Sequence, residues 1–180
     1  KFNIDLTKFN IIHFGMLAIA NGLEYIVKAA LELQNIGNTD INFVFMGSGA
    51  MEPELKKFCE EHKLRNVQFL GKHPVGVVAE VTNCCNASIT SFKNLPILAT
   101  NSPNKLFDSL SAGIPIIVNS AGWTKDLVEM GNCGFYVDVE ILSFRYKGGL
   151  RWFFGVYAWI FMSGGVEAPA EKESYFRRCR

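Results

Sequence analysis

The stretch Asn101-Ser-Pro-Asn-Lys-Leu-Phe-Asp108, continued by Ser109-Leu-Ser-Ala-Gly-Ile-Pro-Ile-Ile-Val118, predicts a loop, a helix and a buried strand in direct succession. Ser102 is able to cap the helix, and Pro103 suits its first turn because a proline there sacrifices no helical hydrogen bond. The helix is expected to stop at Gly113, and the β-branched run that follows is typical of a strand. This segment therefore predicts one helix–strand unit of an α/β protein.

The same alternation runs through the chain up to about residue 139. Short apolar runs predict strands at residues 10–15, 41–46, 66–70, 87–90, 115–119 and 134–137, and helical spacing predicts helices at residues 22–33, 51–62, 75–83, 103–112 and 124–130. Strands that alternate with helices, and that are apolar on both faces, form a parallel sheet covered on both sides. The expected fold class is therefore α/β, a Rossmann-like doubly wound parallel sheet of about six strands with helices on both faces.

Ligands of such sheets bind at the carboxyl ends of the strands, so the loops that leave these ends are candidate binding elements. These loops are Gly15-Met16, Gly47-Ser48-Gly49, Gly71-Lys72-His73-Pro74, Ser91-Phe92 and Asn119-Ser-Ala-Gly122. Four of them contain glycine, which lets a backbone approach a ligand closely. A single glycine is explained better by a tight turn, whereas four on one edge favour a binding edge.

The helix that begins near Pro103 has the features of a phosphate site. Its N-terminus presents free N–H groups and the positive end of the helix dipole, and Lys105 adds a mobile cation. Asp108 lies one turn further along the same face and supplies an acceptor for a ribose hydroxyl. We therefore expect this edge to bind a nucleotide diphosphate. Without the flanking segments, Lys105 and Asp108 are explained better as a solvated helix pair worth a few tenths of a kcal/mol.

Composition argues against several other classes of protein. The 180 residues are 49% hydrophobic and 19% charged with a net charge of +1, which favours a globular domain and gives no bulk reason to expect nucleic acid as a partner. The five cysteines form no C-x-x-C pair and the three histidines stand apart, so we expect reduced thiols and no metal site. No G-x-G-x-x-G follows the first strand, which argues against a dinucleotide dehydrogenase, and no cofactor is expected.

The regular alternation ends near residue 140, which divides the chain into a predicted binding domain, residues 1–140, and an aromatic tail, residues 141–180. Three interpretations of the tail stay open: a segment that covers a hydrophobic surface, an interfacial membrane segment, or a non-native end, which we favour slightly because the pattern stops so abruptly. The apolar run from Trp152 to Met162 is too short to span a bilayer as a helix. The polar start at Lys1 has no signal-peptide pattern, and we expect an excised domain.

Four blocks of the sequence carry a family resemblance. They are Phe14-Gly-Met-Leu-Ala-Ile-Ala-Asn-Gly-Leu23, Phe43-Val-Phe-Met-Gly-Ser-Gly49, Val67-Gln-Phe-Leu-Gly-Lys72, and Ser102-Pro-Asn-Lys-Leu-Phe-Asp108 with Ala112-Gly-Ile-Pro115. These blocks resemble the C-terminal, nucleotide-sugar-binding domain of bacterial glycosyltransferases with the two-domain GT-B fold, over residues 10–139. The last block is the specific one. The resemblance is strongest to retaining transferases of capsule and O-antigen synthesis, including the N-acetylfucosamine transferase type.

The resemblance implies a role for each block. Asp108 would hold the ribose hydroxyls, as a ligand and not as a base, and the diphosphate or the sugar would lie by Lys105 and by the backbone of Ser102-Pro103-Asn104. The Gly15-Met16 loop would approach the diphosphate, and Lys72-His73-Pro74 would frame a base, which is expected to be uracil. The implied activity is transfer of a sugar from a UDP-linked donor to a glycan or lipid-linked acceptor in surface polysaccharide synthesis. The catalytic residues stay unassigned.

The sequence departs from the family pattern in two places. Thr100 stands eight residues before Asp108, where many relatives have another acidic residue that touches the donor sugar. Residues 16–19 lack the basic pair that many relatives carry in the first loop, and Asn21 replaces a frequent lysine. Donor binding is therefore expected to be weak, with Lys105 bearing more of the phosphate charge.

The resemblance also implies that the N-terminal acceptor domain of the fold is missing, so this fragment should bind a nucleotide without transferring sugar. The full-length enzyme is expected in the cytoplasm, near the inner membrane surface. Two alternatives stay open. Half of a sugar-nucleotide epimerase would be expected to show acid–base side chains at its cleft, and a non-catalytic Rossmann-like module would only bind or scaffold.

Overall fold

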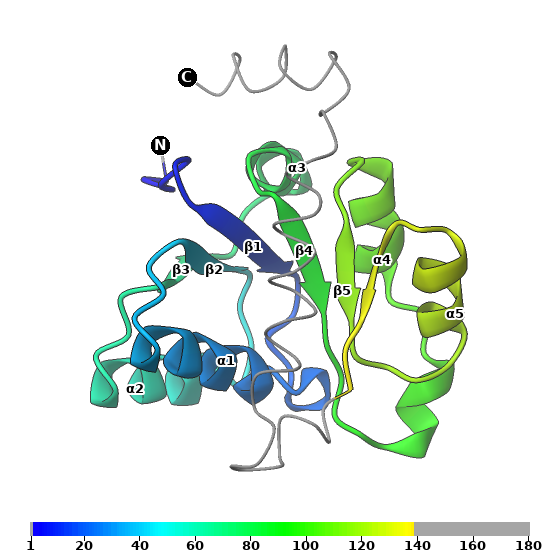
Figure 1. Cartoon of the computed structure of the whole chain (residues 1–180), viewed down its shortest axis with the longest axis horizontal. Coiled ribbons are helices and arrows are strands. Elements are labelled where there is room, and N and C mark those ends of the chain that lie inside the picture. The colour runs from blue at the N-terminus through cyan, green and yellow to red at the C-terminus, as the bar shows by residue number, and fades with distance from the viewer. Residues whose placement is uncertain (1, 139–180) are drawn as a thin grey trace. The chain divides into compact units, whose positions relative to one another are not determined.

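A computed structural model describes residues 2–138 of the chain (Figure 1). Its six strands form one parallel sheet in the order β3-β2-β1-β4-β5-β6. The strands are β1 (Phe9–Phe14), β2 (Ile41–Met46), β3 (Val67–Gly71), β4 (Ala87–Thr90), β5 (Ile116–Val118) and β6 (Gly134–Tyr136). The helices are α1 (Glu24–Asn35), α2 (Glu52–Glu61), α3 (Val75–Asn83), α4 (Asn104–Ser111) and α5 (Trp123–Met130), with short 3-10 helices at Ile19–Asn21 and Pro96–Thr100. The predicted Rossmann-like α/β fold is confirmed.

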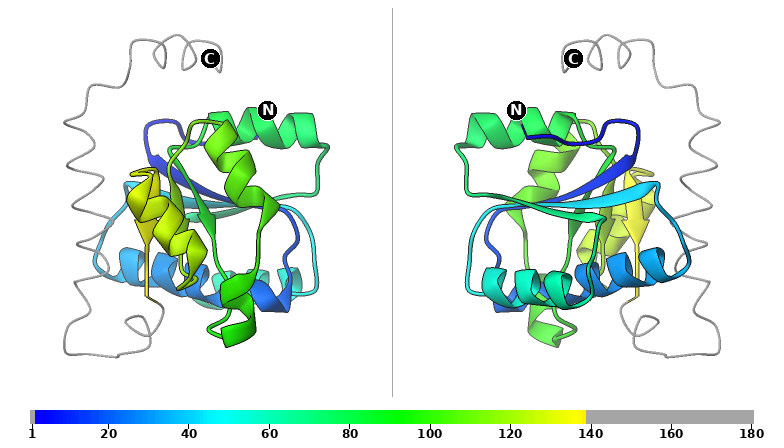
Figure 2. Two further views of the ribbon diagram at one scale, coloured as in Figure 1. Left: turned by 90° about the vertical axis from the view of Figure 1, so that its right-hand side faces the viewer. Right: turned by 90° about the vertical axis from the view of Figure 1, so that its left-hand side faces the viewer.

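Helices cover both faces of the sheet because its central strands are apolar on both faces. Figure 2 shows α1 and α2 on one face and α3 on the other. On the α3 face, Ile12 of β1 and Val44 of β2 pack with Val81 of α3 in one buried cluster. A second cluster joins Leu106 of α4 and Val128 of α5 to β5. Each such side chain contributes about 1.5–3 kcal/mol when it is fully buried.

The order of the strands reverses between β1 and β4. Strand β1 pairs with β2 along its whole length of 6 residues. Its pairing with β4 ends at Ile12 opposite Ser88, although β4 continues to Thr90. We call the place between the carboxyl ends of β1 and β4 the switch point. Doubly wound sheets bind their ligands at this reversal, outside the carboxyl ends of the strands.

Two local predictions about the start of α4 are wrong. Ser102 does not cap the helix, because the N-cap residue is Pro103 and no side-chain hydrogen bond caps this end. Pro103 therefore precedes the helix and is not part of its first turn. The physical reason is that the helix begins one residue later than expected, at Asn104, so Ser102 lies one position before the N-cap, and the N-cap Pro103 has no side-chain oxygen that could accept from the first helical N–H groups.

The predicted boundary at residue 140, and every prediction about residues 141–180, lie outside the described residues. In the described part, residues 2–138, no helix has the length and apolar character needed to cross a membrane. Within this range Cys59, Cys85 and Cys133 are free thiols, and Cys85 is buried in the cluster under α3.

Candidate functional site

A lysine and a histidine meet at the switch point. His13 of β1 is 1% exposed, and its imidazole Nδ1 lies 3.2 Å from the carbonyl oxygen of Ile89 in β4. The ammonium Nζ of Lys105, in the first turn of α4, lies 3.3 Å from Nε2 of the same ring. A Cβ atom on Gly15, directly after β1, would lie 3.8 Å from Lys105 Cε and 3.9 Å from Nζ. The amine of Lys105 is therefore held over the end of β1.

The imidazole of His13 is neutral. Because the Ile89 carbonyl only accepts a hydrogen bond, Nδ1 carries the proton and donates it, and Nε2 is left as an acceptor for the Lys105 ammonium. Burial, followed by the positive charge of Lys105, lowers the pKa of His13 from 6.5 to about 3, against the opposing effect of the Ile89 and Met16 carbonyls. The ring therefore acts as an uncharged acceptor at any physiological pH.

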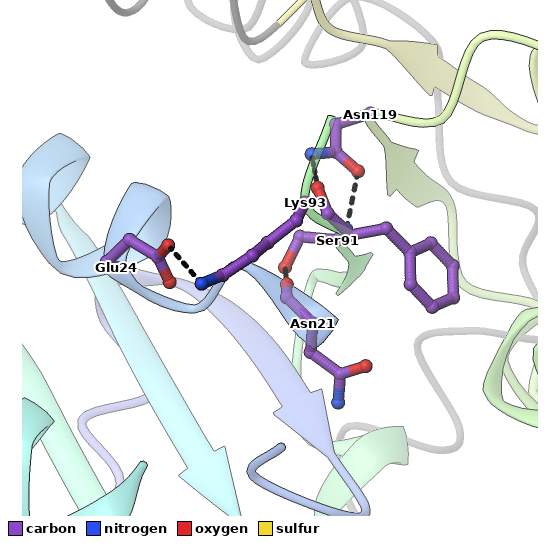
Figure 3. Close-up of polar contacts among 6 residues, drawn as sticks. Asn21, Glu24, Ser91, Lys93 and Asn119 are labelled. Carbon is purple, nitrogen blue, oxygen red and sulfur yellow. Dashed lines mark hydrogen bonds and ion pairs between the residues drawn. The ribbon is translucent and has the colours of Figure 1, made fainter. Parts of the chain in front are cut away.

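Lys105 differs from Lys93 in having no carboxylate that compensates its charge within residues 2–138. Lys93 lies 3.8 Å from Glu24 (Figure 3), whereas no carboxylate pairs with Lys105 in the described part of the chain. Burial lowers the pKa of Lys105 from 10.5 to about 8, so the amine is still mostly protonated at neutral pH. Lys105 is half-buried, and a charge partly withdrawn from water without a counter-ion costs free energy that a bound anion recovers. The arrangement therefore favours an anionic ligand at the switch point.

Acid should destabilise the protein through His13. The pKa of about 3 in the folded chain lies below the ordinary value of 6.5, so between these pH values the unfolded chain binds a proton that the folded chain does not. This contribution to stability is complete above the unfolded pKa and is lost as the pH falls towards the folded pKa, by the order of a few kcal/mol. We expect the free energy of unfolding in urea to fall less from about pH 7 to about pH 4.5 in His13→Gln than in the wild type. If the free energy of unfolding falls by the same amount in the wild type and in His13→Gln over this pH range, the pKa of His13 is not lowered in the folded protein.

The exit loops of β1 and β2 run side by side, which explains one of the four glycines that together predicted a binding edge. The amide of Gly15 donates to the Met46 carbonyl at 2.9 Å, and the amide of Leu17 donates to the Ser48 carbonyl at 3.0 Å. A Cβ atom on Gly47 would overlap the carbonyl oxygen of Gly15. Gly47 is therefore required for packing between the two loops, and its presence is no evidence for a ligand there.

Side-chain hydrogen bonds tie the exit loops of β1, β4 and β5 together (Figure 3). Asn119, directly after β5, pairs with the backbone of Phe92: its amide nitrogen donates to the carbonyl at 2.7 Å, and its oxygen accepts from the N–H at 2.8 Å. The hydroxyl of Ser91 donates to the carbonyl of Asn21 at 2.7 Å. The loops that border the switch point are therefore fixed before a ligand arrives, which reduces the entropy lost on binding.

The structure brings together part of the predicted site. Lys105 contacts the end of β1 at Gly15, and Ser102-Pro103-Asn104 leads directly into the helix turn that carries Lys105. Met16 is 70% exposed, and its carbonyl accepts a hydrogen bond from the Asn21 side chain at 2.6 Å. Asn21, which stands where the resembled family frequently has a lysine, thus closes the β1 exit loop.

Two other predicted parts of the site lie apart from the Lys105 amine. Asp108 is exposed, three residues and about 4.5 Å further along the axis of α4, and no hydrogen bond or ion pair engages its carboxylate within residues 2–138. The segment Lys72-His73-Pro74 follows β3, which lies two strands and about 10 Å from β1. Nε2 of His73 lies 2.8 Å from the Leu70 carbonyl, so this ring is already engaged locally.

His13 is the functional candidate that the sequence analysis missed. A histidine within a strand is ordinarily a satisfied core or edge residue, and His13 is indeed buried and bonded to backbone. Its second partner, Lys105, lies 92 positions away in the sequence, which no local pattern can reveal. The available signal was a polar ring within the apolar run Asn10-Ile-Ile-His-Phe14. Within residues 2–138 no group of three His, Cys, Asp or Glu side chains is placed to hold a metal ion.

Three solved structures show what this fold is similar to. HepE from Anabaena, in a complex with UDP, is 18% identical with a TM-score of 0.61, and the match covers 73% of this chain and 35% of that one. The pneumococcal O-GlcNAc transferase GtfA, in a complex with UDP and GlcNAc, is 16% identical with a TM-score of 0.61, over 95% of this chain and 32% of GtfA. The catalytic domain of the cholesterol-α-glucosyltransferase from Helicobacter pylori is 14% identical with a TM-score of 0.64, over 96% and 97% of the two chains.

At these identities the similarity shows the fold alone, and the chain spans about a third of the length of HepE and GtfA. A search of curated protein sequences found no match. The family described as glycosyl transferases group 1, however, matches residues 1–147, which is most of the chain. This chain therefore belongs to the group 1 glycosyl transferases, enzymes whose solved relatives have the GT-B type of fold.

Proposed function

We propose that this chain is the donor-binding domain of a glycosyltransferase that takes its sugar from a UDP-linked donor. The observation that carries the proposal is the Lys105 ammonium, held over Gly15 at the switch point without a carboxylate partner in the described part of the chain. A half-buried cation at this point of a doubly wound sheet suits a diphosphate. HepE and GtfA, which share the fold, are described in complexes with UDP, and this supports uracil as the base.

The proposed donor lies across the carboxyl edge of the sheet. Its diphosphate meets Lys105, the Gly15-Met16 loop and the backbone of Ser102-Pro103-Asn104. Its ribose reaches the exposed carboxylate of Asp108, and its base lies by Lys72-His73-Pro74. The diphosphate and the base are placed at different strand ends because the β3 exit lies about 10 Å from the β1 exit. A nucleotide that contacts both exits must therefore extend across several strand ends.

We further infer the setting of the reaction. The acceptor is a glycan or a lipid-linked glycan of surface polysaccharide synthesis, of the capsule or O-antigen kind, and the enzyme is of the N-acetylfucosamine transferase type. An N-terminal domain outside this chain supplies the acceptor site, so the chain alone binds the donor without transferring sugar. The enzyme works in the cytoplasm at the inner membrane surface, where a lipid-linked acceptor is presented. The resemblance of the S-P-N-K block supports these inferences.

Isothermal titration of the purified chain with UDP, GDP, ADP and uridine tests the nucleotide. We expect saturable binding that prefers UDP over GDP and ADP, and over uridine, which lacks the diphosphate. If no ligand binds, the titration is repeated with an N-terminal domain restored, because a lone half-site binds weakly. Continued failure to bind would indicate a non-catalytic scaffold in place of a donor domain.

Asp108→Ala tests the proposed ribose contact. We expect the variant to bind UDP more weakly by roughly 1–3 kcal/mol, the range for loss of a hydrogen bond to a charged group. Titration calorimetry measures this change, and Asp126→Ala, which removes an exposed aspartate from α5, is the matched control. Because Asp108 is exposed, the substitution should leave the fold intact. Unchanged affinity in the folded variant would remove Asp108 from the site.

A further inference from the structure

The partner of Lys105 is unusual for a half-buried lysine. A lysine that is withdrawn from water ordinarily pairs with a carboxylate, which holds it in place and cancels its charge. Here the partner is the Nε2 lone pair of an imidazole whose Nδ1 is committed to the Ile89 carbonyl. A neutral acceptor restrains the amine and leaves its positive charge intact.

The residues around Lys105 leave the positive charge of its amine uncompensated and available to a ligand. The only carboxylate on its own helix, Asp108, is exposed, and no acid from β1, β4 or their exit loops pairs with the amine in the described part of the chain. One N–H of the ammonium points to His13, which leaves two donors for a ligand. Fixing a lysine side chain costs rotamer entropy, and the hydrogen bond to His13 restrains the side chain before the ligand binds, so less entropy is lost on binding.

We propose that His13 is a positioning residue that holds the Lys105 ammonium over Gly15, oriented towards the diphosphate of the nucleotide. The proposal rests on the proposed donor-binding function and adds to it a residue from a different strand. His13 is buried at 1% exposure and does not itself reach the ligand, so it acts through Lys105. Replacing His13 should therefore weaken ligand binding only when Lys105 is present and only for a ligand that carries phosphate.

The test compares His13→Leu, which removes the acceptor, with His13→Gln, whose side-chain oxygen can still accept from Lys105. Titration of the full chain should show that His13→Leu binds UDP about tenfold more weakly than the wild type, with uridine affinity unchanged. His13→Gln should recover most of the lost affinity. In a Lys105→Ala background, His13→Leu should cause no further loss. His62→Gln is the control, because the ring of this exposed histidine bonds the backbone of its own helix, at Phe58.

Equal losses for UDP and uridine, or additive losses in the double variant, would overturn the proposal and leave His13 as a packing residue. A second readout needs no nucleotide: the pKa of Lys105, followed by NMR of its side chain, should change in His13→Leu and return towards the wild-type value in His13→Gln. An unchanged pKa in both variants would also overturn the pairing. If the wild-type protein binds no UDP even with an N-terminal domain restored, but the NMR pairing is present, the donor-binding function fails while the contact between the two side chains stands.

Discussion

Gly47→Ala is expected to prevent stable folding of the domain, with a loss of at least about 3 kcal/mol. The new Cβ would overlap the carbonyl oxygen of Gly15 and lie 2.8 Å from its carbonyl carbon. Both groups belong to backbone, so no side-chain rotation relieves the clash. The two loops cannot separate freely either, because hydrogen bonds at 2.9 and 3.0 Å join Gly15 to Met46 and Leu17 to Ser48. Urea unfolding followed by circular dichroism measures the loss.

Gly76→Ala is the matched control for this effect. Gly76 lies in the first turn of α3, no atom lies within 4 Å of the Cβ position, and its backbone does not have positive φ. Alanine has the higher helix propensity, so this variant should be more stable by about 0.5–1 kcal/mol. If Gly47→Ala unfolds within about 1 kcal/mol of the wild type, the close approach of the two loops is not a requirement of the fold.

The fold could be predicted because most of its elements leave an unambiguous periodic pattern. Strand β2 was placed at residues 41–46, as observed, since its run is apolar on both faces. Helix α1 was placed two residues early, at 22–33 and not at Glu24–Asn35. The difference arises because residues 19–21 form a 3-10 turn that Gly22 closes in left-handed backbone, with φ 55. Such a turn is too short to show a periodic pattern.

The site was less predictable because its central contacts are non-local. The sequence singles out Lys105 through the S-P-N-K block, but only the structure shows that its amine meets His13 and the end of β1. Gly47 shows why a single glycine is weak evidence for a ligand. It accommodates the backbone of Gly15, whereas no atom lies within 4 Å of the Cβ position at Gly76.

Lys105→Ala is expected to weaken UDP binding by about 2–3 kcal/mol, or roughly 30- to 150-fold, with uridine affinity nearly unchanged. The physical reason is that the variant loses a half-buried ammonium, whose charge-assisted hydrogen bonds to phosphate are strong and are screened less than those of an exposed lysine. Lys28→Ala, which removes an exposed lysine from α1, is the control for net charge. Calorimetric titration of both variants with both ligands gives the comparison. Equal losses for UDP and uridine in Lys105→Ala would show that Lys105 does not face phosphate.

The pH dependence of binding provides an independent test of the same residue. Because burial lowers the pKa of Lys105 to about 8, the free protein loses this charge as the pH rises through 8, while the diphosphate remains anionic. The ratio of UDP affinity to uridine affinity should therefore fall, by up to about tenfold per pH unit, as the pH rises above 8. In Lys105→Ala this fall should disappear. A wild-type ratio that stays flat up to about pH 10 would mean that the lysine keeps its ordinary pKa, and therefore that its amine is not buried at the switch point.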